Sequence, residues 1–275
     1  MADGPLILGA TGRVGRAFRA LAAAGLWPGP EPVWHGRDSL WAWDMAGPAP
    51  ALPGRPRGVI VLAGATQGGE LAANSRLALA ALDLARARGL WPVLACSSGA
   101  VYGRAATPRR EEDGPQEANA YGLAKWQMEQ DLAAATRPGE ALCCLRLANV
   151  AGCDALFGAM ARGPVVLDRF ADGRTPRRSY VGPLMLARAL TGLIGLHVQG
   201  VALPAVLNLA QPGVVAMDAV LEAAGAPWHP QPAPPGALPQ LSLDGARLAV
   251  LLPLPPATPD ALVAEARAAG WSLPA

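Results

Sequence analysis

Short apolar segments alternate with longer amphipathic segments along most of the chain. The short ones are continuous apolar runs typical of buried parallel strands, and the longer ones repeat apolar residues at helical spacing. Strands are expected at 5–8, 32–35, 40–44, 59–63, 91–96, 141–147 and 206–209. Helices are expected at 16–24, 71–88, 119–129, 184–196, 214–224 and 259–269. This alternation predicts an α/β fold with a Rossmann-type doubly wound parallel sheet.

The pattern changes after residue 152, where the apolar segments become shorter and less regular. We expect residues 153–275 to form a small C-terminal α/β lobe that interleaves with a core built from residues 1–152. The stretch at 227–239 is rich in proline, and we expect it to be a surface loop.

Composition and charge argue against several classes of protein. The 275 residues carry a formal net charge of +2 without a long run of Lys and Arg, so we expect no nucleic-acid partner. No stretch reaches the roughly 18–20 uninterrupted apolar residues of a membrane span, and Asp3 stands where a signal peptide needs a cation. We therefore expect a cytoplasmic protein without a membrane anchor. The four cysteines and three histidines lack metal-ligand spacing, so we expect no metal.

Three glycines follow the first expected strand at a spacing typical of nucleotide-binding turns. Gly9, Gly12 and Gly15 stand between the apolar run at 5–8 and the helix-forming run at 16–24. Glycine lets the backbone turn tightly and approach a pyrophosphate, whose charge then lies at the N-terminus of the helix. A glycine-rich turn that binds no ligand is the alternative, but the order of strand, turn and helix favours nucleotide binding.

The residues after the second expected strand bear on which dinucleotide would bind. A carboxylate there would hydrogen-bond the ribose of NAD, whereas an arginine favours the 2′-phosphate of NADP. Arg37, helped by Arg13 in the glycine turn, favours NADP, and Asp38 keeps NAD as the alternative. A solvated arginine in a turn is the other interpretation of Arg37.

Tyr121 and Lys125 stand four residues apart in the run 119–129, so they share one face of the expected helix. An adjacent ammonium stabilises a phenolate and lowers the pKa of the tyrosine, which makes the pair a candidate for proton transfer. Lys125 is the only lysine in a chain that otherwise uses arginine. Its compact ammonium can bridge a phenol and a sugar hydroxyl, which a planar guanidinium does less easily. The pattern favours a functional pair over a solvated helix face.

Ser97 and Ser98 end the expected strand at 91–96, at the edge of a doubly wound sheet where ligands bind. With this motif, the glycine turn and the Tyr121–Lys125 pair, the chain resembles the extended short-chain dehydrogenase/reductase family, specifically its NAD-dependent epimerase/dehydratase group. The matching segments occur in the order of the family: GATGRVG, VIVLAGAT, NSRLALAALDLARARG, SSGAVYG, NAYGLAK, LRLANVAG and RRSYVGPLMLA.

The resemblance implies an NAD(P)-dependent oxidoreductase or epimerase that acts on a hydroxyl or ketone of a sugar-like substrate, free or nucleotide-linked. It implies that Ser98 hydrogen-bonds the reacting oxygen, that Tyr121 transfers the proton, and that Lys125 tunes Tyr121 and holds the nicotinamide ribose. Cofactor contacts are implied for Gly9, Thr11, Gly12, Arg13, Val14, Gly15, Asp44, Met45, Ala63, Gly64 and Asn74. Substrate contacts are implied for Ser98, Gly99, Asn149 and Arg178.

The resemblance also implies a domain organisation and an oligomeric state. Residues 1–152 would form an NAD(P)-binding Rossmann domain that carries the catalytic residues, 153–275 a substrate-binding lobe, and the protein would be a homodimer. Gly99 and Ala100 stand where dehydratases carry an acidic pair, so we do not expect elimination of water. The short chain favours a small substrate or a simple reductase. A non-catalytic NADP-binding regulator or assembly factor on the same fold is the alternative, which would not need the Tyr121–Lys125 pair.

Overall fold

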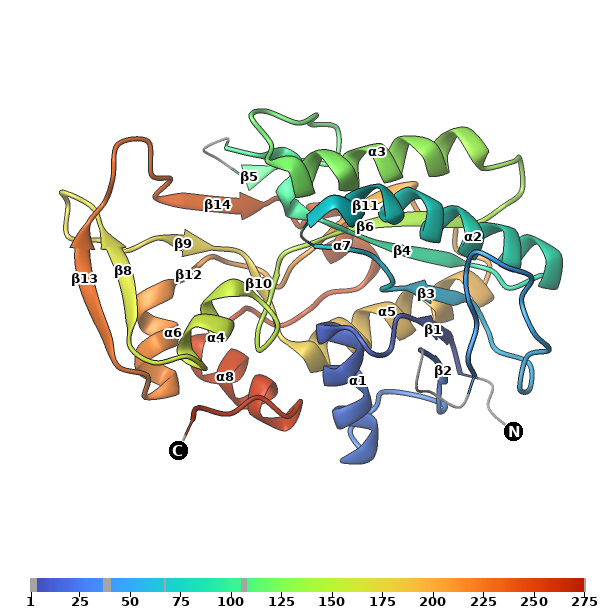
Figure 1. Ribbon diagram of the computed structural model, residues 1–275, viewed down its shortest axis with the longest axis horizontal. Helices are drawn as coiled ribbons and strands as arrows, with labels where there is room; N and C mark the ends of the chain where they lie inside the picture. The colour runs from blue at the N-terminus through green and yellow to red at the C-terminus, as the bar shows by residue number, and fades with distance from the viewer. Residues whose placement is uncertain (1–3, 37–40, 67, 105–107, 275) are drawn as a thin grey trace.

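A computed structural model describes residues 4–36, 41–66, 68–104 and 108–274. Its centre is a six-stranded parallel sheet in the order β11–β6–β4–β3–β1–β2 (Figure 1). The strands are β1 (Leu6–Leu8), β2 (Val33–His35), β3 (Val59–Val61), β4 (Val93–Ser98), β6 (Leu142–Leu147) and β11 (Val206–Leu209). The predicted doubly wound parallel sheet is confirmed.

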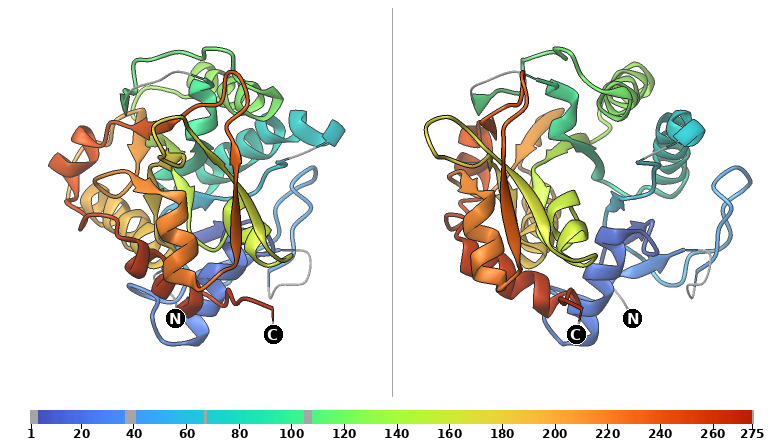
Figure 2. Two further views of the ribbon diagram at one scale, coloured as in Figure 1. Left: turned by 90° about the vertical axis from the view of Figure 1, so that its left-hand side faces the viewer. Right: turned by 60° about the vertical axis from the view of Figure 1, so that its left-hand side comes forward.

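Helices cover both faces of this sheet (Figures 1 and 2). One face packs against α1 (Arg13–Ala23) and α5 (Pro183–Val198), and Phe18 and Leu21 of α1 are fully buried there. The other face packs against α2 (Ala73–Arg88) and α3 (Ala120–Ala135). The inner strands β1, β3, β4 and β6 are therefore buried on both sides, which explains why most of their residues are apolar.

Smaller elements form a lobe beside the carboxyl ends of the central strands (Figure 2). A four-stranded sheet has the order β12–β9–β14–β5, and the pairs β10–β7 and β13–β8 stand apart from it. The strands are β5 (Pro108–Arg109), β7 (Asn149–Val150), β8 (Val165–Arg169), β9 (Arg177–Arg178), β10 (Tyr180–Val181), β12 (Val215–Ala216), β13 (Trp228–Pro232) and β14 (Gln240–Leu243). The helices of the lobe are α4 (Ala155–Met160), α6 (Met217–Ala224) and α8 (Pro259–Ala268). The 3₁₀ turns η1 (Gly68–Ala72) and η2 (Gly99–Tyr102) contact α3, and α7 (Ala246–Leu251) contacts β11.

Two expectations about local structure are wrong. The segment expected as a strand at 40–44 contributes, among its described residues, only an isolated bridge between Trp41 and His35. The indole of Trp41 donates to the Ala51 carbonyl and that of Trp43 to the Gly47 carbonyl, so these large side chains fasten a loop. The proline-rich stretch contains a strand, β13, which pairs with β8 in parallel. Proline is tolerated in a strand at the edge of a sheet, because its missing N–H leaves no ladder bond unmade.

The structure also bears on the cysteines and on the apolar helices. All four cysteines are buried free thiols. Within the described ranges, no helix is both long and apolar enough to cross a lipid bilayer.

Candidate functional site

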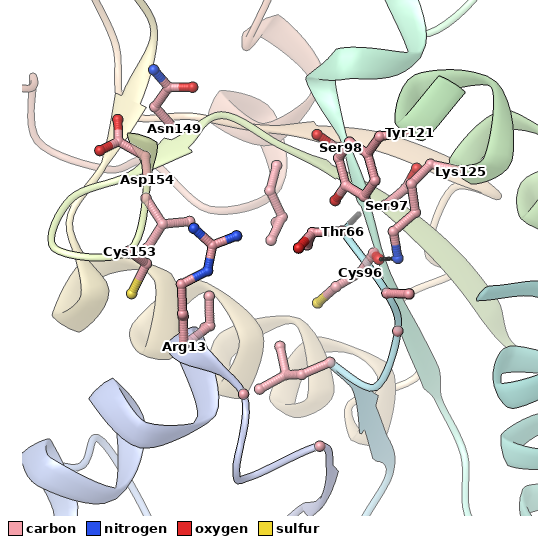
Figure 3. Close-up of a pocket in the computed structure, with 18 of the residues that line it drawn as sticks. Arg13, Thr66, Cys96, Ser97, Ser98, Tyr121, Lys125, Asn149, Cys153 and Asp154 are labelled. Atoms are coloured by element: carbon pink, nitrogen blue, oxygen red, sulfur yellow. Dashed lines mark hydrogen bonds between the residues drawn. The ribbon is translucent and has the colours of Figure 1, made fainter. Parts of the chain in front are cut away.

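A cavity of about 520 Å³ opens at the carboxyl edge of the central sheet (Figure 3). It lies where the strand order reverses, because β1 pairs with β2 on one side and with β3 on the other. The loops that follow β1, β3, β4 and β6 and the start of α3 meet there. The lining consists of Gly9, Gly12, Arg13, Val14, Gly15, Leu62, Gly64, Ala65, Thr66, Cys96, Ser97, Ser98, Asn119, Tyr121, Lys125, Leu147, Ala148, Asn149, Val150, Cys153, Asp154 and Ala155.

The glycine turn after β1 brings the backbone close to its neighbours and leaves space on the cavity side. Gly9 has a φ of +97°, and a Cβ there would lie 2.6 Å from the Ala63 nitrogen. A Cβ on Gly15 would overlap the Gly9 carbonyl, so α1 packs directly on the turn. Gly12 caps α1 without a side-chain hydrogen bond, and a Cβ there would meet only the Gly9 oxygen, at 3.4 Å. These N–H groups at the helix terminus and the open space beside Gly12 fit a dinucleotide pyrophosphate.

Replacement of Gly12 separates the binding role of this turn from its folding role. Gly12 has φ −70° and ψ 173°, which alanine adopts freely, so Gly12→Ala should change the free energy of unfolding by less than about 1 kcal/mol. The added methyl group would occupy the space that we assign to the pyrophosphate. We expect the dissociation constant for NAD(P) to rise at least tenfold in calorimetric titration. In Gly15→Ala, by contrast, the clash with the backbone should lower the melting temperature.

The first turn of α3 is built to bring Tyr121 close to Ser98. The Asn119 side chain caps the helix by accepting a hydrogen bond from the Gly122 N–H at 2.8 Å. A Cβ on Gly122 would overlap the Ala100 carbonyl, so glycine lets this turn approach η2. Tyr121 and Ser98 lie together at one end of the cavity (Figure 3). Lys125 is 5% exposed, and its Nζ donates to the Cys96 carbonyl at 2.9 Å.

The electrostatics at Tyr121 differ from the expectation. Burial raises the pKa of Tyr121, and hydrogen bonding to Ser98 and the charge of Arg13 offset only part of that rise. Burial also lowers the pKa of Lys125, since its ammonium has lost most of its water. The expected lowering of the Tyr121 pKa is therefore not found in the protein alone, where desolvation outweighs the hydrogen bond from Ser98 and the charge of Arg13.

The structure gathers ten of the predicted site residues in the cavity lining: Gly9, Gly12, Arg13, Val14, Gly15, Gly64, Ser98, Tyr121, Lys125 and Asn149. Five described residues predicted to contact the cofactor lie outside that lining: Thr11, Asp44, Met45, Ala63 and Asn74. The Asn74 side chain is fully buried and donates to the carbonyls of Ala65 and Leu71, so it holds the loop after β3. Arg37 lies outside the described residues, as does Asp38.

A second cavity, of about 210 Å³, adjoins the first and contains the remaining predicted substrate residues. Ser98 and Asn149 line both cavities, and Gly99 and Arg178 line the second. The Arg178 guanidinium donates to the carbonyls of Arg177 and Leu238, and burial lowers its pKa. A Cβ on Gly99 would lie 3.2 Å from the Leu243 side chain, so β14 covers this cavity.

Asp154 is a cavity residue that the sequence argument missed. It caps α4 by accepting a hydrogen bond from the Phe157 N–H at 3.0 Å, and it lies near Asn149 and Cys153 (Figure 3). Burial raises the pKa of its carboxyl group to about 6. Its position shortly after the end of an expected strand was the signal that could have found it.

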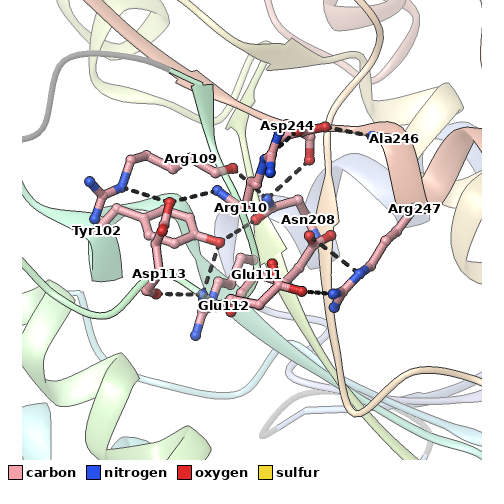
Figure 4. Close-up of polar contacts among 11 residues, drawn as sticks. Tyr102, Arg109, Arg110, Glu111, Glu112, Asp113, Asn208, Asp244, Ala246 and Arg247 are labelled. Carbon is pink, nitrogen blue, oxygen red and sulfur yellow. Dashed lines mark hydrogen bonds and ion pairs between the residues drawn. The ribbon is translucent and has the colours of Figure 1, made fainter.

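A polar network fastens the lobe to the central sheet beside the second cavity (Figure 4). The Tyr102 hydroxyl donates to Asn208 Oδ1 at 2.7 Å, and the Asn208 amide nitrogen donates to the carbonyls of Arg109 and Asp244. The Asn208 backbone N–H donates to Glu111. Asn208 thus connects β11 to both β5 and the segment after β14.

The fold and the cavity together define a Rossmann-type α/β protein with a dinucleotide-sized site that carries a Ser98–Tyr121–Lys125 set. Residues 56–182 match the model of the NAD dependent epimerase/dehydratase family, and this match agrees with the resemblance seen in the motifs. No curated protein matches the chain.

Solved structures with the same fold extend over the whole chain. UDP-glucose 4-epimerase from Brucella ovis, in complex with NAD, is 20% identical with a TM-score of 0.72, covering 99% of this chain and 100% of its own. UDP-glucose 4-epimerase from Bifidobacterium longum, in complex with NAD⁺ and UDP, is 19% identical with a TM-score of 0.70 over 96% and 97% of the two chains. UDP-N-acetylglucosamine 4-epimerase from Bacillus cereus is 14% identical with a TM-score of 0.73 over 96% and 94%. At these identities the similarity establishes the fold.

Proposed function

We propose that the chain is an NAD(P)-dependent oxidoreductase or epimerase that acts on a hydroxyl or ketone of a sugar-like substrate, free or nucleotide-linked. The observation that carries the proposal is the convergence of Ser98, Tyr121 and Lys125 on one end of the larger cavity, which the glycine turn also lines. The family match at 56–182 and the NAD-bound structures of similar fold support it. A homodimer remains a prediction.

The chain offers places for the pyrophosphate and for the nicotinamide ribose of a nicotinamide dinucleotide. The glycine turn and the N-terminus of α1 would hold the pyrophosphate, and Lys125 the nicotinamide ribose. When bound, the nicotinamide supplies the hydride chemistry. The preference for NADP predicted from Arg37 stays a prediction, and the solved structures of similar fold from Brucella ovis and Bifidobacterium longum are complexed with NAD.

Tyr121 and Ser98 would then act on the substrate oxygen. In the direction of reduction, Tyr121 donates its phenolic proton to that oxygen and Ser98 donates a hydrogen bond to it. The second cavity, which Ser98 also lines, would hold the rest of the substrate beside Arg178, which is one of two arginines in its lining. A phosphate or other anionic group of the substrate fits that position.

The proposal is tested by calorimetric titration with NADP and NAD separately, followed by absorbance scans at the nicotinamide band with nucleotide sugars and simple ketones. Tight binding with a substrate-dependent absorbance change indicates a reductase or dehydrogenase. Tight binding without a net change leaves an epimerase that recycles its hydride or a non-catalytic regulator, and product analysis by NMR separates these two. If neither nucleotide binds, the proposal fails.

The raised pKa of Tyr121 predicts opposite pH profiles for the two directions of reaction. Reduction needs the protonated phenol, which persists through neutral pH when the pKa is raised, so kcat/KM should stay level from about pH 6 to 8. Oxidation needs the phenolate, whose fraction below the pKa grows about tenfold per pH unit. Steady-state rates in both directions check this. A rate of oxidation that is level over the same pH range would contradict it.

A further inference from the structure

Two buried side-chain hydrogen bonds fasten the end of β4 to α3, one on each of the two residues before Ser98. Lys125 Nζ donates to the Cys96 carbonyl, and the Ser97 hydroxyl donates to Glu129 Oε1 at 2.5 Å. Ser97 and Glu129 are each 3% exposed. Tyr121, Lys125 and Glu129 are spaced by four residues on α3, so three successive turns of the helix present them on one face, toward the end of β4.

Glu129 is itself held rigidly from the neighbouring strand. Ser97 and Arg146 are register partners on β4 and β6, so their side chains lie side by side on the face that α3 covers. The Arg146 guanidinium donates to Glu129 through Nη2 at 2.8 Å and through Nε at 3.1 Å. It also donates to the Tyr102 hydroxyl at 2.8 Å and stacks between the rings of Tyr102 and Trp126. A carboxylate fixed in this way is a firm anchor for the Ser97 hydroxyl.

We propose that Ser97 and Glu129 are positioning residues, which hold the Ser98 hydroxyl and the Tyr121 hydroxyl in register for proton transfer. The proposal rests on the proposed function for its catalytic consequence. Ser97 also lines the larger cavity, but its positioning role requires no contact with substrate or cofactor, and neither does that of Glu129. The Ser97–Glu129 hydrogen bond fixes where α3 lies relative to the end of β4. A displacement of about 1 Å between catalytic groups such as Ser98 and Tyr121 can lower a rate about a hundredfold.

Removal of the Ser97 hydroxyl is the sharpest test, because Glu129 keeps both hydrogen bonds from Arg146. We expect Ser97→Ala to lower kcat roughly 10- to 100-fold while KM and the dissociation constant for NAD(P) stay within about threefold. Ser97→Thr restores the hydroxyl on a residue that suits a strand, and should recover most of the loss. If Ser97→Ala does not fold, Ser97→Cys keeps the volume and offers only a weak donor, with the same expected direction.

Thr136→Val is the matched control for a general loosening of α3. The Thr136 hydroxyl donates to the Leu132 carbonyl at 2.7 Å at the far end of the same helix, and valine removes it without changing the volume. This variant should keep the wild-type kcat. A similar fall in kcat in both variants would overturn the positioning role.

A second measurement does not depend on turnover. The chain has three tyrosines, so ¹³Cζ-tyrosine NMR gives three signals that Tyr121→Phe assigns. The groups that bear on Tyr121 are Ser98 and Cys96 from β4 and Arg13 from α1. We expect the Tyr121 signal of Ser97→Ala to titrate at higher pH than in the wild type, because the hydrogen bond from Ser98 is weakened.

The two measurements separate the possible failures. If the wild type turns over no substrate, the proposed function fails, and the Tyr121 titration still tests the positioning role. A Tyr121 signal that titrates identically in the wild type and in Ser97→Ala overturns the positioning role, whatever the activity.

Discussion

Tyr121→Phe should lower kcat by roughly 10²- to 10⁴-fold, which is the usual contribution of a positioned general acid or base. Phenylalanine keeps the ring and its packing in the cavity and removes only the phenolic hydroxyl. The affinity for NAD(P) should stay within about twofold, because the glycine turn and Lys125 are unchanged. Stopped-flow absorbance at the nicotinamide band measures the rate, and calorimetry measures the affinity.

The pattern of loss distinguishes a chemical role of Tyr121 from a structural one. A fall in kcat with an unchanged melting temperature supports proton transfer by Tyr121. If Tyr121→Phe is as active as the wild type on an identified substrate, the assigned mechanism is wrong. If the melting temperature and the nucleotide affinity fall together with kcat, the hydroxyl serves the structure of the site.

Arg146→Met should destabilise the protein more than any surface substitution. Both side chains of the Arg146–Glu129 pair are 2% exposed, and the pair is joined at 2.8 Å. Methionine would leave the Glu129 carboxylate buried with Ser97 as its remaining side-chain donor among the described contacts. Removing one partner of such a pair costs about 3–5 kcal/mol. We expect the melting temperature to fall by about 10 °C, measured by calorimetry.

An exposed ion pair supplies the matched control for the buried one. Arg174 pairs with Asp172 at 2.5 Å, with side chains 72% and 46% exposed, so Arg174→Met should leave the melting temperature nearly unchanged. The double variant Arg146→Met with Glu129→Leu should recover part of the lost stability, since no uncompensated charge is left. Equal losses in Arg146→Met and Arg174→Met would show that the buried pair is not a structural anchor.

Local patterns in the sequence were enough to predict the architecture and the centre of the site. Burial on both faces makes each central strand a continuous apolar run, so β1, β3, β4 and β6 could be located from hydrophobicity alone. The glycine spacing predicted the turn at Gly9–Gly15, and the spacing of four residues predicted a shared helix face for Tyr121 and Lys125. Each of these signals involves residues that are close to one another in the sequence.

Long-range packing decided the rest. The strand β13 forms because β8 offers it an edge, although its own composition predicts a loop. Gly122 matters because the Ala100 carbonyl occupies the place of its side chain, and Ser97 matters because Glu129 and Arg146 meet it from two other elements. None of these contacts can be recognised from the spacing of residues along the sequence.

The direction of the Tyr121 pKa shift also shows the difference between what local sequence predicts and what long-range packing decides. The sequence by itself determined that a phenol and the single lysine lie on one helix face. Only the tertiary structure decided that both would be buried, that the ammonium would bind the Cys96 carbonyl, and that desolvation would raise the pKa of the phenol. Proximity follows from the period of a helix, whereas desolvation depends on everything that packs around the helix, such as α2, η2 and β4.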